Sequence, residues 1–162
     1  MESWPALLVL LMIVAAVGWY GGVVTLPKIP NWYAGLVKPS FNPPPWVFGP
    51  VWTSLYILMA IAAWRVWSSE APQRAKRTAL VLFGIQLFLN ALWSPLFFGA
   101  ERPLWAFVDI VLLCGFVVLT LVRFAQIDRP AGWMLAPYLV WIVFAAVLNG
   151  AIVFLNPATM AI

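Results

Sequence analysis

Long apolar stretches dominate this chain, and charged residues divide them into five blocks. Asp109 is the one charged residue inside a block. The blocks cover residues 3–27, 39–64, 78–100, 103–122 and 130–162. About 20 apolar residues carry a helix across ~30 Å of hydrocarbon, so every block is long enough to span a membrane. Porin-like strands would show short alternating segments, and these blocks do not alternate. We therefore predict helices over 5–26, 46–67, 78–98, 103–124 and 131–156.

The composition agrees with a location in the membrane. Residues of the AVILMFWYC set make up 65% of the sequence and charged residues 9%, against roughly 45–50% and about 25% in soluble proteins. We predict an all-α membrane protein, a single domain of residues 1–162 that forms a five-transmembrane-helix bundle with a long Pro-rich loop between helices 1 and 2. The first block is interpreted as a retained helix rather than a signal peptide, because Glu2 precedes it and no basic residue does.

Charge and missing residue types narrow the function. A net charge of +4 from nine Lys and Arg residues is too small for a nucleic-acid surface, so we expect no nucleic-acid partner. The chain has no histidine and one cysteine, Cys114. Histidine is the commonest metal ligand and general base. We therefore expect no metal site, no resident cofactor and no hydrolysis by a Ser–His or Cys–His pair.

The basic residues predict an orientation. Five spans put the two termini on opposite sides of the membrane. The basic residues on the N-terminal side are Arg65, Arg74, Lys76, Arg77, Arg123 and Arg129, and those on the other side are Lys28, Lys38 and Arg102. Because positive residues concentrate in cytoplasmic loops, we predict a cytoplasmic N-terminus. Helical spans favour an inner membrane over an outer one.

The loop over residues 27–45 is the one long connection. It holds six prolines in 19 residues and is not helical. Its Trp32, Tyr33 and Phe41 predict packing rather than disorder, so we interpret it as a lid over one mouth of the bundle. A plain connector is the alternative.

Polar residues within the spans are few and share helix faces. Gln86, Asn90, Trp93 and Phe97 lie on one face of the third helix. The two amides serve either a ligand or neighbouring helices, and Pro95 is expected to kink this helix. Asp109 lies about two turns into the fourth helix. It is either a functional group or the partner of Arg102, seven residues earlier.

Aromatic residues meet these amides at one level. Trp52 and Tyr56 share a face of the second helix. Tyr138, Trp141, Ala145 and either Leu148 or Asn149 share one on the fifth. At 1.5 Å per residue, Trp52, Asn90 and Trp93 lie about 8–12 Å below the loop side and Trp141 about 22 Å below it. Such a layer fits a large, flat, apolar ligand. Five other tryptophans fit an interfacial belt: Trp4, Trp46, Trp67, Trp105 and Trp133.

Four stretches resemble the TspO/MBR family, the translocator proteins or peripheral benzodiazepine receptors. KPSFNPPPWVFGPVWTSLYILMAIAAWRV (38–66) resembles the family's loop and second helix. QLFLNALWSPLFFG (86–99) resembles its third-helix signature, N-x-x-W-[ST]-P-x-F-F. WAFVDIVLL (105–113) and PYLVWIVFAAVLNGAIVFLN (137–156) look like its fourth and fifth helices. The similarity covers nearly the whole chain.

The resemblance implies a five-helix homodimer that binds tetrapyrroles such as protoporphyrin IX and benzodiazepine-type or isoquinoline-type ligands beneath the first loop. It also implies that Trp52 and Trp141 match tryptophans linked to light-dependent porphyrin breakdown. The implied ligand-binding residues are Tyr33, Pro43, Trp52, Tyr56, Asn90, Trp93, Trp141, Ala145 and Leu148. The vertebrate cholesterol pattern L/V-x-Y-x-K/R is missing, and the short uncharged C-terminal tail is of a bacterial type.

Two hypotheses on assembly and three on function follow. A dimer interface is compatible with Gly18 and Gly22 on the first helix or with Gly84 and Ala91 on the third, although close packing within one bundle explains each equally. The preferred function is a membrane receptor or sensor for porphyrins. The alternatives are light-dependent porphyrin degradation, with Trp52 and Trp141 as catalytic residues, and a transporter of porphyrins or other flat lipids.

Overall fold

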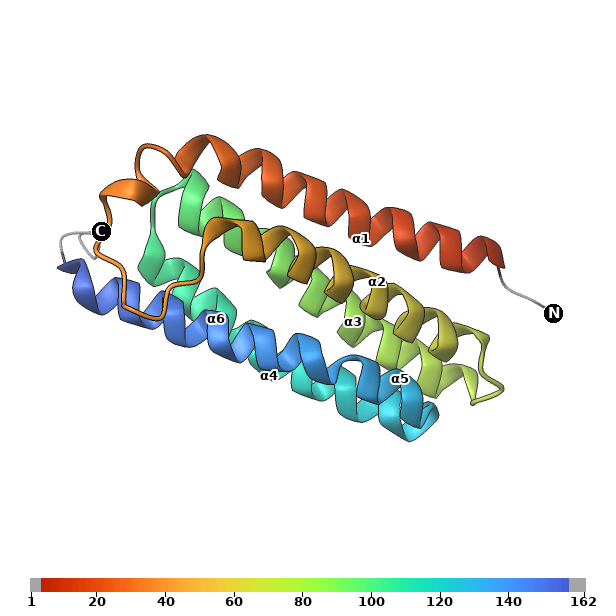
Figure 1. Cartoon of the computed structure of the whole chain (residues 1–162). Helices are drawn as coiled ribbons and strands as arrows, with labels where there is room; N and C mark the ends of the chain where they lie inside the picture. Colours follow the sequence, from red (N-terminus) through yellow and green to blue (C-terminus); the bar gives the residue numbers. More distant parts are fainter. Residues whose placement is uncertain (1–3, 158–162) are drawn as a thin grey trace.

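A computed structural model describes residues 4–157 of the chain. Within them, five segments are long and apolar enough to cross a membrane, so the chain is an integral multi-pass membrane protein with the predicted five-span helical fold (Figure 1). The spans are formed by α1 (Trp4–Thr25), α2 (Phe48–Ser68), α3 (Gln73–Ser94), α4 (Pro103–Ile127), and α5 (Arg129–Met134) with α6 (Ala136–Leu155).

The observed helix bounds differ from the predicted ones at several places, and α3 ends at Ser94 rather than at residue 98. Helix α3 begins at Gln73 rather than at residue 78, because its Gln, Arg and Lys residues are good helix formers despite their polarity. Helix α4 continues to Ile127 rather than to residue 124. The fifth span is interrupted at Leu135, between α5 and α6, where Pro137 has no backbone N–H to continue the ladder.

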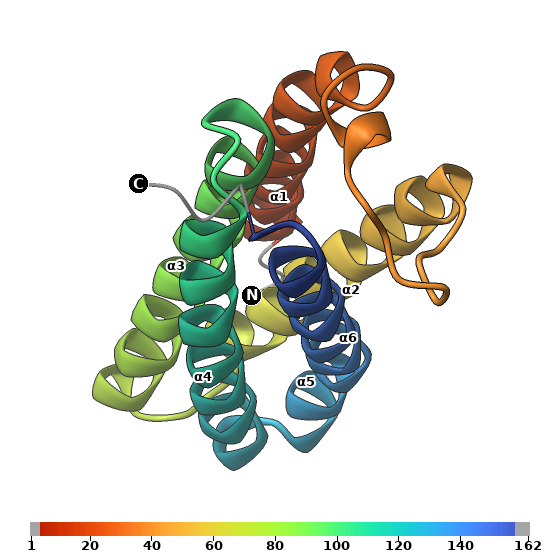
Figure 2. The same ribbon diagram turned by 90° about the vertical axis from the view of Figure 1, so that its left-hand side faces the viewer.

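The helices differ in how deeply they are buried. Helix α4 packs against both α3 and α6, whereas α1 lies at the edge against α2 and α3. Val14 is the buried residue of α1, while α4 buries eight residues including Asp109. Figure 2 shows the bundle from the end at which the loop connects α1 to α2. Helix α1 therefore presents most of its surface to its surroundings.

Small residues allow two close helix contacts. A Cβ on Gly132 of α5 would lie 2.5 Å from the Cβ of Ala125 in α4, and one on Gly18 of α1 would lie 2.9 Å from the ring of Tyr56 in α2. Gly18 thus serves packing inside the bundle. Gly22 has nothing within 4 Å of such a Cβ.

The predicted kink at Pro95 is a wide helical turn. Residues Pro95–Gly99 form a π-helix (η4), in which the amide of Ala100 donates to the carbonyl of Pro95 at 2.7 Å. Both Phe97 and Phe98 are buried as a result. Glu101 follows with a φ of 57°, and this left-handed residue turns the chain into α4.

The loop (residues 26–47) packs against the bundle, as its aromatic residues predict. It contains three short 3-10 turns, η1 (Leu26–Lys28), η2 (Tyr33–Gly35) and η3 (Pro45–Val47). Lys28 forms a 2.7 Å ion pair with Glu101. The side chain of Asn156 bonds to both the amide and the carbonyl of Val37, at 2.9 and 2.8 Å. These contacts fasten the loop to the ends of η4 and α6.

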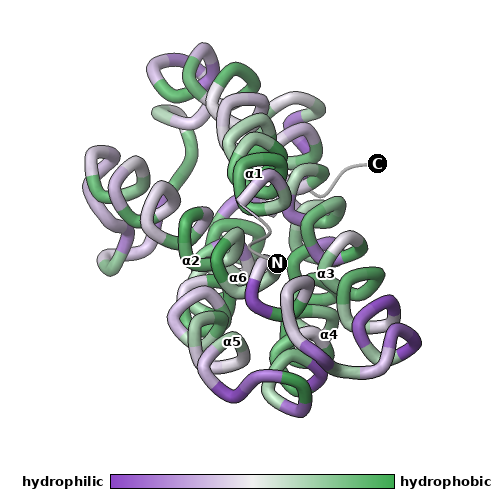
Figure 3. The backbone as a smooth tube through the Cα atoms, turned by 90° about the vertical axis from the view of Figure 1, so that its right-hand side faces the viewer, coloured by the Kyte–Doolittle hydropathy of each residue, from purple (hydrophilic) through white to green (hydrophobic). Residues whose placement is uncertain are grey.

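The opposite end of the bundle, called the charged end below, carries most of the charged residues. Figure 3 shows hydrophilic stretches where α3 begins and where α4 passes into α5. Here Arg65 of α2 pairs with Asp128 at 2.9 Å. Asp128 also caps α5 by accepting a hydrogen bond from the amide of Ala131. One carboxylate thus connects α2 to the start of the fifth span.

Candidate functional site

A chain of hydrogen bonds crosses the bundle interior. Tyr56 of α2 donates to Asn90 of α3 at 2.8 Å, and the amide of Asn90 donates to Tyr138 of α6 at 3.1 Å. Tyr138 donates in turn to Gln86 at 2.9 Å. The amide of Gln86 lies 3.9 Å from the sulfur of Met59. These bonds satisfy polar groups that would be costly in hydrocarbon and fix the side chains of three helices relative to one another.

The predicted amide face on α3 thus serves neighbouring helices. Tyr138 is the central partner and is fully buried. It shares a predicted face with Trp141, but it is missing from the ligand-binding residues that the family resemblance implies. Helical periodicity alone does not show which tyrosine a given amide reaches across the bundle.

Trp93 belongs to a second polar connection nearer the loop. Its indole N–H donates to Asn149 of α6 at 3.0 Å, and the amide of Asn149 donates to the carbonyl of Pro103 at 2.9 Å. Trp93 also stacks on Phe97, with centroids 4.8 Å apart. Asn149 therefore joins α3, α4 and α6, although the family resemblance implies its neighbour Leu148 for the site.

An aromatic layer lies beside these networks. Trp52 stacks on Tyr56, with centroids 5.3 Å apart, and meets Tyr138 edge-on at 6.2 Å. Trp141 contacts Phe48 of α2 edge-on at 5.8 Å. The layer therefore joins α2 to α6 through ring contacts.

The loop adds its own ring to the layer. Phe41 lies 6.4 Å from Phe144, which is 5.5 Å from Trp141. Phe41 is exposed. Phe144 thus lies between Trp141 and the loop residue Phe41 and contacts both rings.

Trp141 has an unused hydrogen-bond donor. Its indole nitrogen is buried, and it has no hydrogen-bond partner among the described residues. Most buried polar atoms are paired, so an unpaired one in an aromatic site needs an explanation. A ligand that brings an acceptor would supply the missing partner.

Tyr33 anchors the loop rather than the aromatic layer. Its hydroxyl donates to Asn42 at 2.9 Å, and its ring contacts Phe98 at 5.6 Å. The ammonium of Lys38 lies 4.8 Å from the centre of the Tyr33 ring. Burial raises the pKa of the Tyr33 hydroxyl, and the Asn42 hydrogen bond lowers it by a smaller amount.

The expected site residues divide between two clusters. Trp52, Tyr56, Trp141 and Ala145 pack on the main core. Tyr33 and Leu148 belong to a smaller cluster around Phe97 and Phe98, and Trp93 contacts both clusters. Asn90 lies in the hydrogen-bonded chain. Pro43 lies in the loop, where its carbonyl accepts from Asn42 at 3.4 Å.

Asp109 does not pair with Arg102 as expected. Asp109 is 4% exposed, and neither of its oxygens has a hydrogen-bond partner within residues 4–157. The reason lies in the backbone of Arg102, whose φ of −117° and ψ of 72° place it outside the helix. Helical spacing therefore does not bring its side chain onto the face of Asp109.

The tryptophans fall into the two expected groups. Trp52, Trp93 and Trp141 are partly buried. The five belt residues are between 53% and 75% exposed: Trp4, Trp46, Trp67, Trp105 and Trp133. The inner group and the belt are thus distinct in the structure.

Comparison with known proteins agrees with the family resemblance. The sequence profile of the TspO/MBR family matches residues 9–155. The chain is 49% identical to the tryptophan-rich protein TspO of Chlorobaculum tepidum over 143 residues, which are 88% of this chain and 90% of that protein. It is 40% identical to the tryptophan-rich sensory protein of Cereibacter sphaeroides over 146 residues, 90% of each. It is 44% identical to the translocator protein of Homo sapiens over 120 residues, 74% and 71% of the two chains.

Proposed function

The chain belongs to the TspO/MBR family, and we propose that it is a membrane receptor or sensor that binds tetrapyrroles such as protoporphyrin IX. Benzodiazepine-type and isoquinoline-type ligands would occupy the same site. The observation that carries the proposal is the buried indole N–H of Trp141 in the aromatic layer, for which residues 4–157 provide no acceptor. The proposed ligand-binding residues are Tyr33, Pro43, Trp52, Tyr56, Asn90, Trp93, Trp141, Ala145 and Leu148.

Each part of the site has a task in binding. The rings of Trp52 and Trp141 offer apolar faces to a flat ligand. The hydrogen bonds of Asn90 hold Tyr56 and Tyr138 in place before the ligand arrives, so little side-chain entropy is lost on binding. The indole N–H of Trp141 donates to a nitrogen or oxygen of the ligand. The loop excludes water while its contacts with Glu101 and Asn156 hold.

A titration with protoporphyrin IX in the dark tests the proposal, with the porphyrin absorbance band of the detergent-purified protein as the readout. We expect saturable binding that weakens about tenfold in Trp141→Phe, since this change keeps a ring but removes the donor. Trp133→Phe, which alters an exposed belt tryptophan, is the matched control and should bind normally. Equal affinity of both variants and the unchanged protein would remove Trp141 from the site.

A second candidate function is light-dependent porphyrin degradation. The stacked rings of Trp52 and Tyr56 support it, since adjacent oxidisable rings can exchange electrons with an excited porphyrin. Trp52 and Trp141 would be the catalytic residues, and dioxygen the oxidant. Under light, the porphyrin band should decay faster with the protein than with Trp52→Phe/Trp141→Phe, and no faster in the dark. Equal decay rates at equal porphyrin occupancy would contradict this activity.

The setting in the membrane is part of the proposal. The N-terminus lies in the cytoplasm, since the end of the bundle with six basic residues faces inward.

Two copies form a homodimer through faces with small residues. Gly22 and Gly84 support this, because nothing lies within 4 Å of a Cβ built on either.

A further inference from the structure

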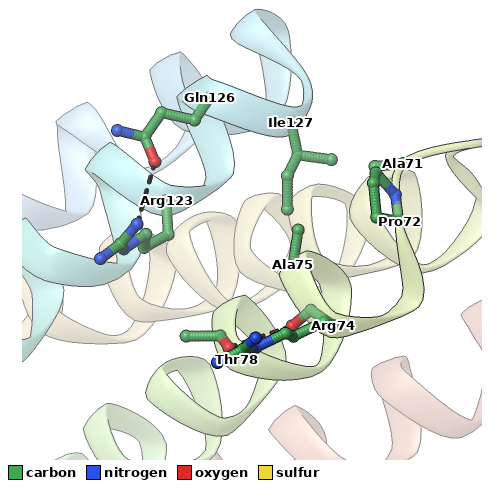
Figure 4. A pocket seen from close by; sticks show the side chains of 8 residues that line it. All are labelled: Ala71, Pro72, Arg74, Ala75, Thr78, Arg123, Gln126 and Ile127. Carbon is green, nitrogen blue, oxygen red and sulfur yellow. Dashed lines mark hydrogen bonds between the residues drawn. The ribbon is translucent and has the colours of Figure 1, made fainter.

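A groove of about 600 Å³ lies at the end of the bundle opposite the loop. It runs between the beginning of α3 and the end of α4, which are adjacent because the two helices are antiparallel (Figure 4). Its walls include Pro72, Arg74 and Thr78 from the α3 side and Arg123, Gln126 and Ile127 from the α4 side. No residue that lines it carries a carboxylate, so the groove is positively charged.

The two arginines of the groove have little protein to bind. Arg123 makes one long bond, 3.4 Å, to the side-chain oxygen of Gln126. The guanidinium of Arg74 has no hydrogen bond or ion pair with another side chain among residues 4–157. A planar guanidinium offers several N–H donors in a fork that matches phosphate oxygens. Two such groups therefore line the groove, and most of their N–H donors have no partner among the described residues.

Other basic residues at this end have structural tasks. Lys76 donates to the carbonyls of Trp67 and Ser69 at 3.2 and 3.0 Å, where it closes the end of α2. Arg65 pairs with Asp128 at 2.9 Å. Lys76 and Arg65 thus stabilise the bundle, whereas Arg74 and Arg123 line the groove.

The first turn of α3 lacks the negative charge that helices favour. It contains no acidic residue, and Pro72 at its N-cap gives no side-chain hydrogen bond. The positive end of the helix dipole therefore adds to the charge of Arg74 instead of opposing it. An anion bound in the groove would offset both.

The surface next to the groove is apolar. Val81 on α3 is exposed one turn beyond Thr78, and Leu119 and Val122 on α4 are exposed just before Arg123. The exposed belt residues Trp67 and Trp133 lie at the same end of the bundle, as expected near a headgroup region. A phosphate in the groove thus has a path for attached acyl chains along the two helices.

We propose that this groove binds the phosphate of an anionic membrane phospholipid. The guanidiniums of Arg74 and Arg123 clamp the phosphate oxygens, and the amide of Gln126 donates to the headgroup. The acyl chains lie along Val81 and Leu119. This site is at the opposite end of the bundle from the aromatic layer and does not depend on the proposed receptor function.

Native mass spectrometry of the full chain in detergent micelles, titrated with phosphatidylglycerol, tests the proposal. The unchanged protein should retain one lipid, and Arg74→Gln/Arg123→Gln should bind it about 30-fold more weakly, because each basic residue contributes to headgroup attraction. Arg77→Gln/Arg129→Gln is the matched control, since it removes the same charge from the same end without touching the groove. The control should stay within about twofold of the unchanged protein.

Three further measurements distinguish a lipid phosphate from free phosphate and from diffuse charge attraction, and single variants replace the double variant if it does not fold. Equal loss in both double variants, or equal retention of phosphatidylcholine and phosphatidylglycerol, would overturn the proposal in favour of diffuse attraction. If millimolar inorganic phosphate alone raises the melting temperature as much as the lipid does, the site binds free anions and the lipid assignment is wrong. Should the groove variant not fold by circular dichroism, the single variants Arg74→Gln and Arg123→Gln each carry the test, with about fivefold loss expected.

Discussion

The two ends of the bundle are built for different degrees of movement. At the charged end, residues 69–72 alone connect α2 to α3, and Asp128 alone separates α4 from α5. At the other end, the long loop of residues 26–47 is held by ring contacts such as Tyr33 with Phe98 and by a few polar contacts with Glu101 and Asn156. The short connections at the charged end therefore restrict the helices there, and we expect the loop end to open more readily. Ligand exchange is expected at the end where the connection is long and its polar contacts are few.

The largest effect is expected where the charged end is packed most tightly. Gly132→Ala should lower the free energy of unfolding by about 3 kcal/mol, because the new Cβ would lie 2.5 Å from the Cβ of Ala125 and 2.7 Å from its Cα. Gly115→Ala in α4, with nothing within 4 Å, is the control and should be neutral or slightly stabilising. Thermal unfolding in detergent measures both. Similar melting temperatures for the two variants would show that the contact between α4 and α5 can accommodate an extra methyl group without loss of stability.

A smaller loss is expected in the bundle interior. Asn90→Leu removes the acceptor of Tyr56 and the donor to Tyr138, and we expect a loss of about 1–2 kcal/mol in the free energy of unfolding. Thr53→Val is the control, because its hydroxyl is exposed and bonds only within its own helix, to Gly49. Thermal unfolding again gives the difference. Ligand affinity should fall in Asn90→Leu alone, and a fall in both variants would argue against a specific role for this network.

The loop contacts should affect opening more than overall stability. Asn156→Ala removes both bonds to Val37 and should cost at most about 1 kcal/mol in the free energy of unfolding. Limited proteolysis within residues 26–47 should nevertheless become faster, and so should porphyrin association. Lys28→Gln should have a weaker effect of the same kind, because its ion pair is partly exposed to solvent. Unchanged cleavage in both variants would mean that ring packing alone holds the loop.

The smallest effect concerns alkaline pH and Tyr33. Burial raises the pKa of this hydroxyl above its value in the unfolded chain, so the folded loop favours the neutral form. The stabilisation is complete below the unfolded pKa and is lost as the pH rises from there through the folded pKa. Cleavage of the loop should therefore increase above pH ~10, and Tyr33→Phe should remove this pH dependence. The same alkaline increase in Tyr33→Phe would assign the effect to another group.

The sequence predicts the five spans and the polar face of the third span well, because both follow from local periodicity. Hydropathy locates all five helices, and the helical repeat places Gln86, Asn90 and Trp93 on one face. The pairing of Asn90 with Tyr138 depends on how α3 and α6 are rotated against each other, which no local pattern encodes. The expected pair of Asp109 and Arg102 is wrong for a related reason: Arg102 lies just outside the helix that begins at Pro103, and its non-helical backbone removes its side chain from the helical spacing.

The wide turn at Pro95–Gly99 determines the direction in which the side chains at the end of the third span point. A turn of this kind holds one residue more than an α-helical turn, and consecutive residues of an ordinary helix point about 100° apart. The buried neighbours Phe97 and Phe98 both reach the bundle interior here. Removing one residue from this turn would rotate everything that follows by about a quarter of a circle. The length of this five-residue segment is therefore as strict a requirement as its composition, and a single-residue deletion here would be more harmful than most substitutions.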